Sequence, residues 1–402
     1  MDGSSPNTAE KPVSKIDFVN LTAGITDLSS AAPQPSNRDL VDQAAVELGG
    51  PVMVCTRDYV DEALRAHATF SSSDLIEQGN SLPLIPLNID PPDHVKYRKL
   101  LDPLFSPRRM DALETDITER VNHFIDTFAD RGACNFTMEF AELFPSSVFL
   151  GMMGLPWEEL DTLVALRDGL LRPGERTMAP EERSAIQRAT AQRVYEYFDG
   201  ILDERAAAPQ DDILSMFVQV EADGDRLTRD EVLAICFVLL TAGLDTVTDS
   251  LTCFFSFLAQ NPGHRRQLVA QPELIPGAVE ELLRWETPVP SVVRWAREDS
   301  IVGGCPVSAG NHVIVNLSAA NLDPAEFPDP MEVRFDREVN RHLAFGGGVH
   351  RCLGSHLARR ELRVALAEWH RRIPEYTLAE GYEVSYLPPL RYVPDLQLAW
   401  PT

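Results

Sequence analysis

The residues with the clearest potential for chemistry lie in one loop and the helix expected after it. Residues 342–362 read HLAFGGGVHRCLGSHLARREL, a glycine-rich stretch that leads through Cys352 into an amphipathic pattern. A cysteine at a helix N-terminus has a lowered thiol pKa, because free N–H groups and the helix dipole stabilise negative charge. Glycines such as Gly346 and Gly354 let the backbone approach a flat ligand. The loop therefore predicts a metal-binding thiolate, with Phe345 placed to shield the sulfur from water.

The same residues also occur in commoner structures that bind no metal. A lone cysteine beside a helix is most often a small core residue, and a glycine run is most often a turn. A dinucleotide fingerprint starting at Gly346 would need glycine at position 351, which is Arg351, and no lysine follows as in a phosphate-binding loop. The residues alone leave a core cysteine and a metal-bound thiolate as alternatives.

A second unusual segment is AGLDT at 242–246, in the middle of a long apolar stretch. Glycine costs about 1 kcal/mol inside a helix relative to alanine. Asp245 and Thr246 are costly in an apolar interior unless they find partners. Small residues beside an acid and a hydroxyl predict a locally opened helix turn with room for a ligand. A polar stripe facing the surface, with an incidental glycine, is the alternative.

Both segments resemble those of cytochromes P450. The family's haem loop, FxxGxHxCxG, is matched at every position by Phe345, Gly348, His350, Cys352 and Gly354, and AGxDT resembles the family's oxygen-binding groove. The resemblance covers nearly the whole chain beyond its N-terminal segment. It implies a mainly helical fold with a small β-sheet region and one haem b. Cys352 would be the axial iron ligand, whose electron donation favours O–O cleavage.

The resemblance also implies roles for polar residues. Thr246 would hydrogen-bond dioxygen and water beside the haem, and Asp245 would relay protons from solvent. The haem propionates need buried cations, and arginine suits carboxylates well. The implied propionate partners are His94, Arg98, Arg294 and His350, of which His94 and Arg98 share one helix face by their spacing. Further expected haem contacts are Ala242, Gly243, Phe345, Gly346 and Gly354.

A structural motif accompanies these sites. Glu281 and Arg284 match the family's ExxR pair, and Arg337 ends the run PMEVRFDR at 330–337, where the family has a third member. Taken alone, an i, i+3 pair is weak evidence, because such surface pairs are common. The resemblance implies a buried ion-pair frame behind the haem.

The expected substrate pocket is mostly aliphatic. Stretches such as GLP at 154–156 and HLARRE at 356–361 are similar to the camphor-hydroxylase branch of the family. Leu82 stands where that branch has a tyrosine that holds the substrate ketone, so this polar anchor for camphor is missing. An aliphatic pocket favours a compact apolar molecule held by shape, and we expect a terpenoid or norisoprenoid. For each expected pocket residue ordinary core packing is the alternative; these are Ile76, Leu82, Leu84, Leu87, Val238, Thr241, Pro290, Val292 and Val293.

The implied activity is insertion of one oxygen atom from O2 into a C–H bond. Electrons would come from a [2Fe-2S] ferredoxin and its NAD(P)H-dependent reductase. An acidic ferredoxin would be steered to a basic patch near Cys352; scattered solvated charges are the alternative for the expected patch residues Arg98, Arg108, Arg109, Arg359 and Arg360. A peroxygenase driven by H2O2 would tend to lack the acid–threonine pair, and a haem-thiolate sensor or carrier needs no O–O cleavage. The intact Asp245–Thr246 pair disfavours both.

The elements that position these residues are expected to be mainly helical. Helical periodicity is clear in 110–130, 181–206, 229–260, 273–285 and 353–372, and strand-like runs occur at 51–55, 300–302, 312–316 and 396–400. Helices with a few scattered strands exclude a regular βαβ alternation. We expect one domain over residues 16–402, preceded by a flexible tail at 1–15.

The composition of the chain indicates which classes of partner and which cellular compartment to expect. With 61 acidic and 36 basic residues the net charge is -25, so nucleic acid is not expected, because phosphate binding needs a basic surface. The six cysteines contain no CxxC pair, which disfavours a zinc site. The first residues, MDGSSPNTAEKPVSK, lack the apolar core of a signal peptide. A cytoplasmic protein with reduced thiols is the simplest expectation.

One apolar run needs to be distinguished from a membrane span. VLAICFVLLTAG at 232–243 is shorter than the roughly 20 apolar residues that a span requires. Asp245 and Asp249 follow it, and carboxylates in a membrane are costly. A helix buried in the protein core is expected, with no membrane attachment.

Overall fold

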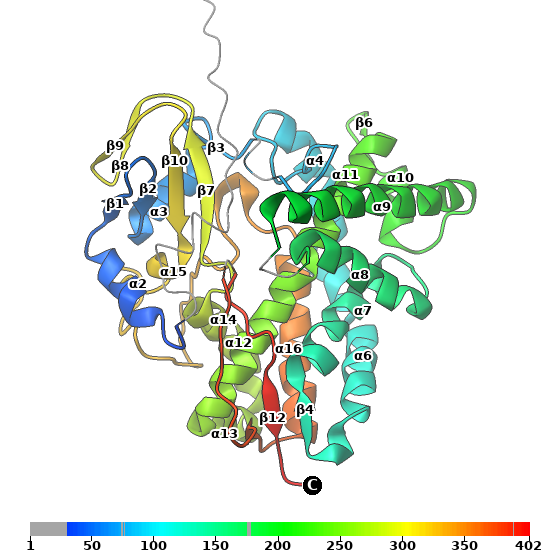
Figure 1. Cartoon of the computed structure of the whole chain (residues 1–402), viewed down its shortest axis with the longest axis vertical. Coiled ribbons are helices and arrows are strands. Elements are labelled where there is room, and N and C mark those ends of the chain that lie inside the picture. Colours follow the sequence, from blue (N-terminus) through cyan, green and yellow to red (C-terminus); the bar gives the residue numbers. More distant parts are fainter. Residues whose placement is uncertain (1–29, 74, 76, 175–177, 389) are drawn as a thin grey trace, which may run out of the picture.

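The computed structural model describes residues 30–402 apart from 74, 76, 175–177 and 389. The expected tail at 1–15 and the pocket residue Ile76 lie outside the described residues. Within the described part the chain is mainly helical, as predicted, and the five-stranded sheet and the β8–β9 hairpin lie at one side of the molecule, while β4 and β12 lie near its other end (Figure 1). The single domain over 16–402 stays a prediction.

Helices form most of the core and the side remote from the five-stranded sheet. Two short helices belong to the strand-rich side, α2 (Gln34–Val41) and α3 (Arg57–Arg65). The following helices are α4 (Asp93–Leu101), α5 (Pro107–Ala112), α6 (Glu114–Asp126), α7 (Leu143–Met152), α8 (Leu160–Leu171), α9 (Pro180–Ala207), α10 (Ile213–Gln219), α11 (Arg229–Gly243), α12 (Asp245–Gln260), α13 (Pro262–Ala270), α14 (Ile275–Glu286), α15 (Leu317–Ala320) and α16 (Ser355–Arg372).

The largest sheet has five strands in the order β1-β2-β10-β7-β3. Its strands are β1 (Ala45–Glu47), β2 (Val52–Val54), β3 (Phe70–Ser71), β7 (Ser291–Ala296) and β10 (His312–Asn316). β10 runs parallel to β2 and antiparallel to β7. A second sheet joins β11 (Thr377–Leu378), β12 (Gln397–Ala399) and β4 (Ala133–Asn135), and two hairpins pair β5 (Glu221–Ala222) with β6 (Asp225–Arg226) and β8 (Ser300–Val302) with β9 (Cys305–Val307).

The sequence predicts one helix over 229–260, and the structure divides it. α11 begins with a capping box in which Thr228 Oγ1 accepts from the Glu231 N–H and Glu231 Oε2 accepts from the Thr228 N–H at 2.7 Å. The regular helix is interrupted at Leu244, between α11 and α12. By length and composition the combined segment could cross a membrane, but 72% of its most apolar window is buried inside the protein. It is therefore a core helix, as expected, with an opened turn at its middle.

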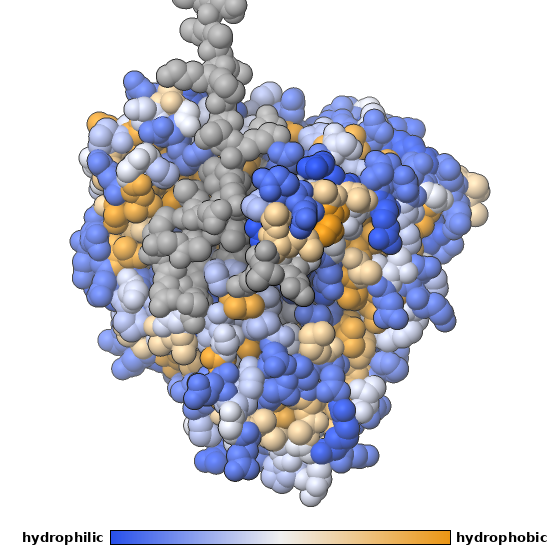
Figure 2. All heavy atoms as spheres, in the orientation of Figure 1, coloured by the Kyte–Doolittle hydropathy of each residue, from blue (hydrophilic) through white to orange (hydrophobic). Residues whose placement is uncertain are grey.

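Other predicted elements differ mainly at their ends. The helix predicted over 110–130 is divided into α5, α6 and a one-turn 3₁₀ helix at Ala129–Arg131. The helix predicted from 273 is a 3₁₀ turn followed by α14, since prolines at 272 and 276 each favour a new helix start. Strands β2 and β12 are shorter by one residue at each end than the predicted runs. Hydrophilic side chains cover most of the visible surface over α9 and α10 (Figure 2), in keeping with the charged composition.

An aromatic cluster fixes α12 against α16. Trp369 of α16 is fully buried, and its ring centroid lies 5.0 Å from that of Phe255 of α12. Phe136 and Phe140 complete the cluster at 5.1 and 5.4 Å from Trp369, all in edge-on arrangements. These contacts set the relative position of the two helices that begin at Asp245 and just after Cys352.

Candidate active site

The loop before Cys352 packs directly on α3. Gly348 has φ +63°, and a Cβ atom there would lie 2.2 Å from the Leu64 carbonyl oxygen, so only glycine fits. The loop then turns back on itself, because the Cys352 N–H donates to the Phe345 carbonyl at 2.9 Å. Phe345 is thereby tied beside Cys352, as the shielding role requires.

Cys352 differs from the other cysteines in its surroundings. Cys55, Cys134, Cys236 and Cys253 are buried and Cys305 is half-buried, whereas the Cys352 side chain is exposed. The sulfur can thus be reached, yet dense protein around it raises the pKa of the Cys352 thiol by desolvation. The Gly354 N–H and nearby guanidinium groups act in the opposite direction. The lowered pKa expected from the helix N-terminus is therefore wrong for the free thiol; a bound metal ion would itself deprotonate the sulfur.

The junction of α11 and α12 is open on one side. Ala242 and Gly243 are exposed, although Thr241, Leu244 and Asp245 around them are buried. A Cβ atom at Gly243 would meet nothing within 4 Å. The half-buried Thr246 donates its hydroxyl to the Ala242 carbonyl at 3.1 Å. This small-residue opening beside a hydroxyl agrees with the locally opened helix turn that the sequence predicts; its use by a ligand stays a prediction.

Asp245 lies on the inner side of this junction between two arginines. Its Oδ1 is 3.2 Å from Arg172 Nη2 and 3.5 Å from Arg167 Nε. Burial raises the pKa of Asp245, and the two guanidinium groups offset that rise only in part. Arg167 and Arg172 also pair with Glu142, at 3.2 and 2.7 Å. Sequence reasoning missed these partners, since nothing in the α8 sequence distinguishes them from surface charges.

The four predicted propionate partners gather near the Cys352 loop. The rings of His94 and His350 lie 4.4 Å apart. Arg98 donates to the Arg351 carbonyl at 2.9 Å, beside Cys352. Arg98 and Arg294 both lie close enough to lower the pKa of His350, after burial, which is the largest cause.

Two of these groups lack the partners that buried polar atoms normally have. Among the described residues, His94 Nε2 is buried without a hydrogen bond. Arg294 is 8% exposed, donates to the Val293 carbonyl at 2.7 Å and has no ion pair with the described residues. Burial lowers the pKa of Arg294 to about 10 and that of His94 to about 4. A carboxylate placed here would satisfy both groups, so the residues present fit a haem with its propionates.

Asp90 anchors the cluster and was missed as a site residue. It accepts from Ser71, from Ser72 at 3.0 Å and from Arg297 at 2.6 Å, and lies 3.6 Å from His350 Nε2. Burial raises the pKa of Asp90, but hydrogen bonds from His350, Ser71, Arg297 and Ser72 together hold it far below its usual range. The run of three serines at 71–73 is the one sequence signal for this network.

The comparisons with known proteins agree with this geometry. A family model described as cytochrome P450 matches residues 170–274 and 267–372. The chain is 38% identical over 321 residues to a probable cytochrome P450 127A1 from Sinorhizobium fredii, covering 80% of this chain and 74% of that protein. It is 36% identical over 320 residues to a mycinamicin IV hydroxylase/epoxidase from Micromonospora griseorubida, covering 78% and 75%. CYP109E1 from Bacillus megaterium, solved in complex with corticosterone, has a TM-score of 0.84 at 27% identity, covering 92% and 98% of the two chains.

The chain belongs to the cytochrome P450 family. The predicted fold is confirmed, and so is the expectation of a monooxygenase that uses haem b. Assignment to the camphor-hydroxylase branch stays a prediction.

The ExxR residues of this P450 form a buried frame. Glu281 and Arg284 are fully buried and paired at 2.8 Å, and Arg337 Nε lies 3.1 Å from Glu281. Arg284 also donates to the carbonyls of Asn321, Pro330 and Glu332 at 2.9–3.0 Å. The frame therefore ties α14 to the chain that leads into the Cys352 loop.

The predicted pocket residues of the P450 do not all share one environment. Leu84 and Val238 are buried in one cluster, against which Leu82 packs, whereas Val292 packs against the cluster under the large sheet. Thr241, Pro290 and Val293 are buried, and Leu87 is exposed at 37%. The Thr241 hydroxyl donates to the carbonyls of Phe237 and Val238 at 3.0 and 3.2 Å. The Thr241 hydroxyl is therefore already hydrogen-bonded within its own helix.

The expected basic patch is corrected by the structure. Arg359 is clamped by Glu280 at 2.8 Å, Arg360 pairs with Asp111 and Glu114, and Arg98 pairs with Asp102 at 2.8 Å. Carboxylates thus compensate three of the five expected cations, while Arg108 and Arg109 are exposed.

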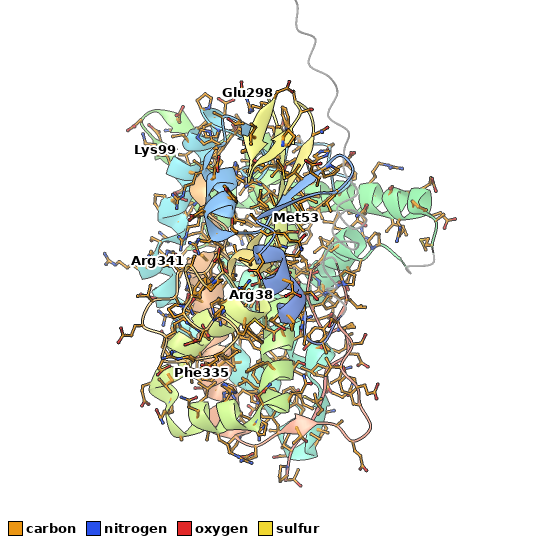
Figure 3. All side chains as sticks on the ribbon, turned by 90° about the vertical axis from the view of Figure 1, so that its left-hand side faces the viewer. Arg38, Met53, Lys99, Glu298, Phe335 and Arg341 are labelled. Carbon is orange, nitrogen blue, oxygen red and sulfur yellow. The ribbon has the colours of Figure 1, made fainter. Side chains whose placement is uncertain are left out.

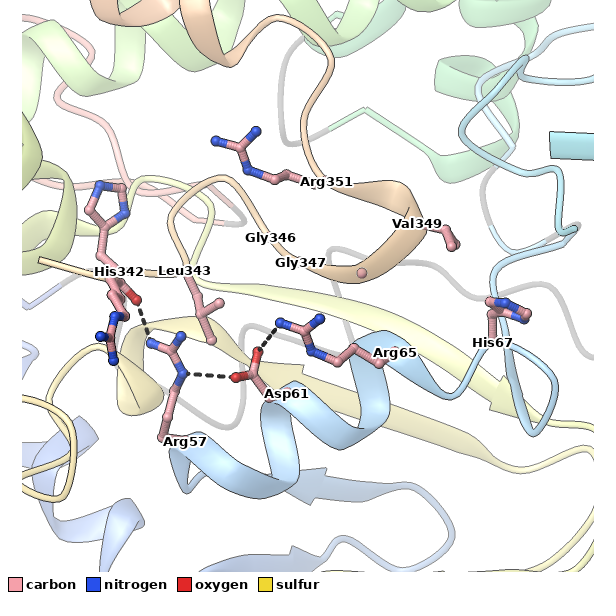
Figure 4. Close-up of a pocket in the computed structure, with 12 residues that line it drawn as sticks. Arg57, Asp61, Arg65, His67, His342, Leu343, Gly346, Gly347, Val349 and Arg351 are labelled. Atoms are coloured by element: carbon pink, nitrogen blue, oxygen red, sulfur yellow. Dashed lines mark hydrogen bonds and ion pairs between the residues drawn. The ribbon is translucent and has the colours of Figure 1, made fainter. Parts of the chain in front are cut away.

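A different basic groove lies on the outer side of the Cys352 loop (Figure 4). It measures about 580 Å³, and its single acidic lining residue, Asp61, is shared by Arg57 and Arg65 at 3.3 and 3.9 Å. Arg341, on its rim, points away from the body of the protein (Figure 3) and is 71% exposed. The lining also includes His67, Gly346, Gly347, Gly348 and Arg351.

Proposed function

We propose that this P450 hydroxylates a compact apolar alicyclic compound, a terpenoid or norisoprenoid, in the cytoplasm, with electrons from a [2Fe-2S] ferredoxin. The observation that carries the proposal is the acid–hydroxyl pair at an opened helix turn. Thr246 lies beside exposed Ala242 and Gly243, and Asp245 lies just inside with a raised pKa. A sensor or carrier needs no such pair.

Each cofactor residue has an assigned task. Bound haem supplies the redox chemistry that activates oxygen. Cys352 would hold its iron through the sulfur, with Phe345 keeping water from that sulfur. Arg294 and His94 would hold the propionates with Arg98 and His350, since His94 Nε2 is buried without a hydrogen bond to the described residues and Arg294 has no ion pair with them.

The proton path uses the residues of the junction. Thr246 holds water at the opening through its hydroxyl, which is already oriented by the Ala242 carbonyl. Asp245 carries protons inward, because burial raises its pKa and so favours its protonated form more than in an exposed carboxyl. Arg172, which is 26% exposed, connects Asp245 to the surface side.

The proposed substrate class follows from the side chains that are predicted to line the substrate pocket. The predicted pocket side chains are aliphatic, and the one hydroxyl among them, that of Thr241, is engaged by backbone carbonyls. Shape then selects the substrate more than polar contacts do. The GLP and HLARRE stretches shared with the camphor-hydroxylase branch support an alicyclic substrate, and Leu82 disfavours camphor itself.

Three experiments test the function. The reduced protein with carbon monoxide should give the spectrum of a thiolate-ligated haem, and Cys352→Ser should abolish it; a thiolate spectrum that persists in the variant contradicts the assignment. Product formation is then compared with NADH plus a ferredoxin and reductase, with H2O2 alone, and with neither. Turnover by H2O2 alone would indicate a peroxygenase, and no turnover a sensor or carrier. Spin-state shifts across terpenoids, corticosterone and macrolides test the substrate class.

A further inference from the structure

Arg359 lies over the ring that covers the Cys352 loop. Its guanidinium carbon is 4.3 Å from the Phe345 ring centroid, within the range in which a cation is attracted to an aromatic face. The Phe345 carbonyl accepts the Cys352 N–H at 2.9 Å. A positive charge on α16 is therefore linked to the cysteine through one ring and one backbone hydrogen bond.

Glu280 of α14 holds this guanidinium in place. Arg359 Nε lies 2.8 and 2.9 Å from the two oxygens of Glu280, and Arg359 Nη2 lies 2.8 Å from Oε2. Such a fork contact fixes both the position and the plane of the guanidinium. Burial would raise the pKa of Glu280, but His342 and Arg359 hold it at about 2. The carboxylate is therefore charged throughout the neutral range.

His342 fixes Glu280 from the other side. Its Nδ1 accepts the Ala344 N–H at 3.1 Å, so Nε2 carries the proton and donates to Glu280 Oε2 at 3.0 Å. The His342 side chain is 1% exposed, and its ring centroid lies 5.9 Å from that of Phe345. Three elements, α14, α16 and the loop, thus meet in one set of contacts around the ring.

We propose that Arg359, oriented by Glu280 and His342, is a positioning residue that holds Phe345 against the Cys352 loop and raises the reduction potential of the cysteine-bound iron through its charge. The inference rests on the proposed ligation of haem by Cys352. A nearby cation favours addition of an electron, and charge and hydrogen bonding around a metal ligand tune its potential. Internal pairing also explains why Arg359 is poorly placed to serve as a free docking charge.

The test compares substitutions at Arg359 with one at its neighbour Arg360. Arg360 pairs with Asp111 and Glu114 on α5 and α6, away from Phe345, so Arg360→Gln is a matched loss of one charge. The reduction potential of the haem-loaded proteins is measured with small dye mediators, which avoids any effect on ferredoxin docking. Arg359→Gln should shift the potential to more negative values, Arg359→Lys should shift it less, and Arg360→Gln should leave it near that of the parent.

Further outcomes separate this inference from the proposed function. A potential unchanged in Arg359→Gln overturns the inference, and so do equal shifts in Arg359→Lys and Arg359→Gln, because charge would then not be the cause. Glu280→Gln, which keeps the size and an acceptor of the clamp but removes its negative charge, should shift the potential to more positive values, opposite to Arg359→Gln, and it serves if Arg359→Gln does not fold. If the parent lacks a thiolate carbon monoxide spectrum, the proposed ligation itself fails; a normal parent spectrum with unshifted variants defeats only the role of Arg359.

Discussion

Asp245 Oδ1 lies 3.2 Å from Arg172 Nη2, so the acid expected to carry protons is held by a residue from the end of α8. Burial raises the pKa of Asp245, and Arg172 is the largest influence that lowers it. The charge state of the junction therefore depends on a contact between residues far apart in the sequence.

Substitution of Arg172 should move the pH dependence of turnover. If protonated Asp245 supplies protons, activity declines as pH rises through its pKa. Loss of Arg172 removes a lowering influence, so Arg172→Met should shift this decline to higher pH. The ratio of product to NADH is measured across pH, with Arg226→Met as the control, because Arg226 pairs with Glu221 in the distant β5–β6 hairpin. A decline that stays at the same pH would argue against Asp245 as the donor.

Removal of the Thr246 hydroxyl should uncouple electron use from product formation. The Thr246→Ala variant should consume NADH at a rate similar to that of the parent while releasing peroxide. It lacks the hydroxyl that is proposed to hold water for proton delivery at the junction of α11 and α12. Thr246→Ser should keep most of the coupling. Thr118→Ala is the matched control, since Thr118 makes the same hydroxyl contact to the carbonyl four residues back, at 2.7 Å on the surface of α6. Full coupling in Thr246→Ala would contradict the role.

The Glu281–Arg284 frame should be essential for stability. Breaking a buried ion pair by removing one partner costs about 3–5 kcal/mol, a large part of the stability of an ordinary domain. Glu281→Gln should therefore lower the urea midpoint strongly and release haem early in the transition. Glu368→Gln removes a partner from a pair with the same spacing, whose Arg371 is 61% exposed, and should cost less than about 1 kcal/mol. Equal costs in the two variants would show that the frame is not structural.

Arg294 should contribute to haem retention. A hydrogen bond to a charged group is worth about 1.5–3 kcal/mol, which corresponds to roughly a 10- to 100-fold faster haem loss in Arg294→Met. The rate is measured by transfer to an excess of a haem-scavenging protein. Arg266→Met is the control, because Arg266 is 66% exposed and pairs with Glu375 at 3.3 Å, outside the cluster around His94 and His350. Similar rates for the two variants would remove Arg294 from the propionate site.

The sequence predicts residues whose task is local better than those that act through distant partners. Cys352, Gly348 and the Glu281–Arg284 pair lie in short patterns whose spacing carries the chemistry; in the structure Gly348 packs on Leu64 and Glu281 pairs with Arg284. Arg172, Glu280 and Asp90 were missed because a single charged residue looks the same on a surface as in a core. Their pairing is set by how helices pack; Arg172 and Asp245, for example, are 73 positions apart. Arg359 and Arg360 were expected to be free surface charges because their carboxylate partners also lie far away in the sequence.

The groove beside the Cys352 loop should receive the ferredoxin. Arg65 and Arg341 are 69% and 71% exposed there and have only long contacts to carboxylates, at 3.9 Å from Asp61 and 3.6 Å from Glu326. Arg351 is also exposed in this groove of a strongly acidic protein, whereas Arg359 and Arg360 are held in closer ion pairs. Reversal of two charges, Arg65→Glu with Arg341→Glu, should slow reduction by an acidic ferredoxin at low salt and leave substrate affinity unchanged. The effect should shrink as salt rises, because screening removes long-range steering. Arg108→Glu with Arg109→Glu is the matched control with two exposed cations outside the groove. If this control slows reduction as much as the groove variant does, ferredoxin binding is not centred on the groove.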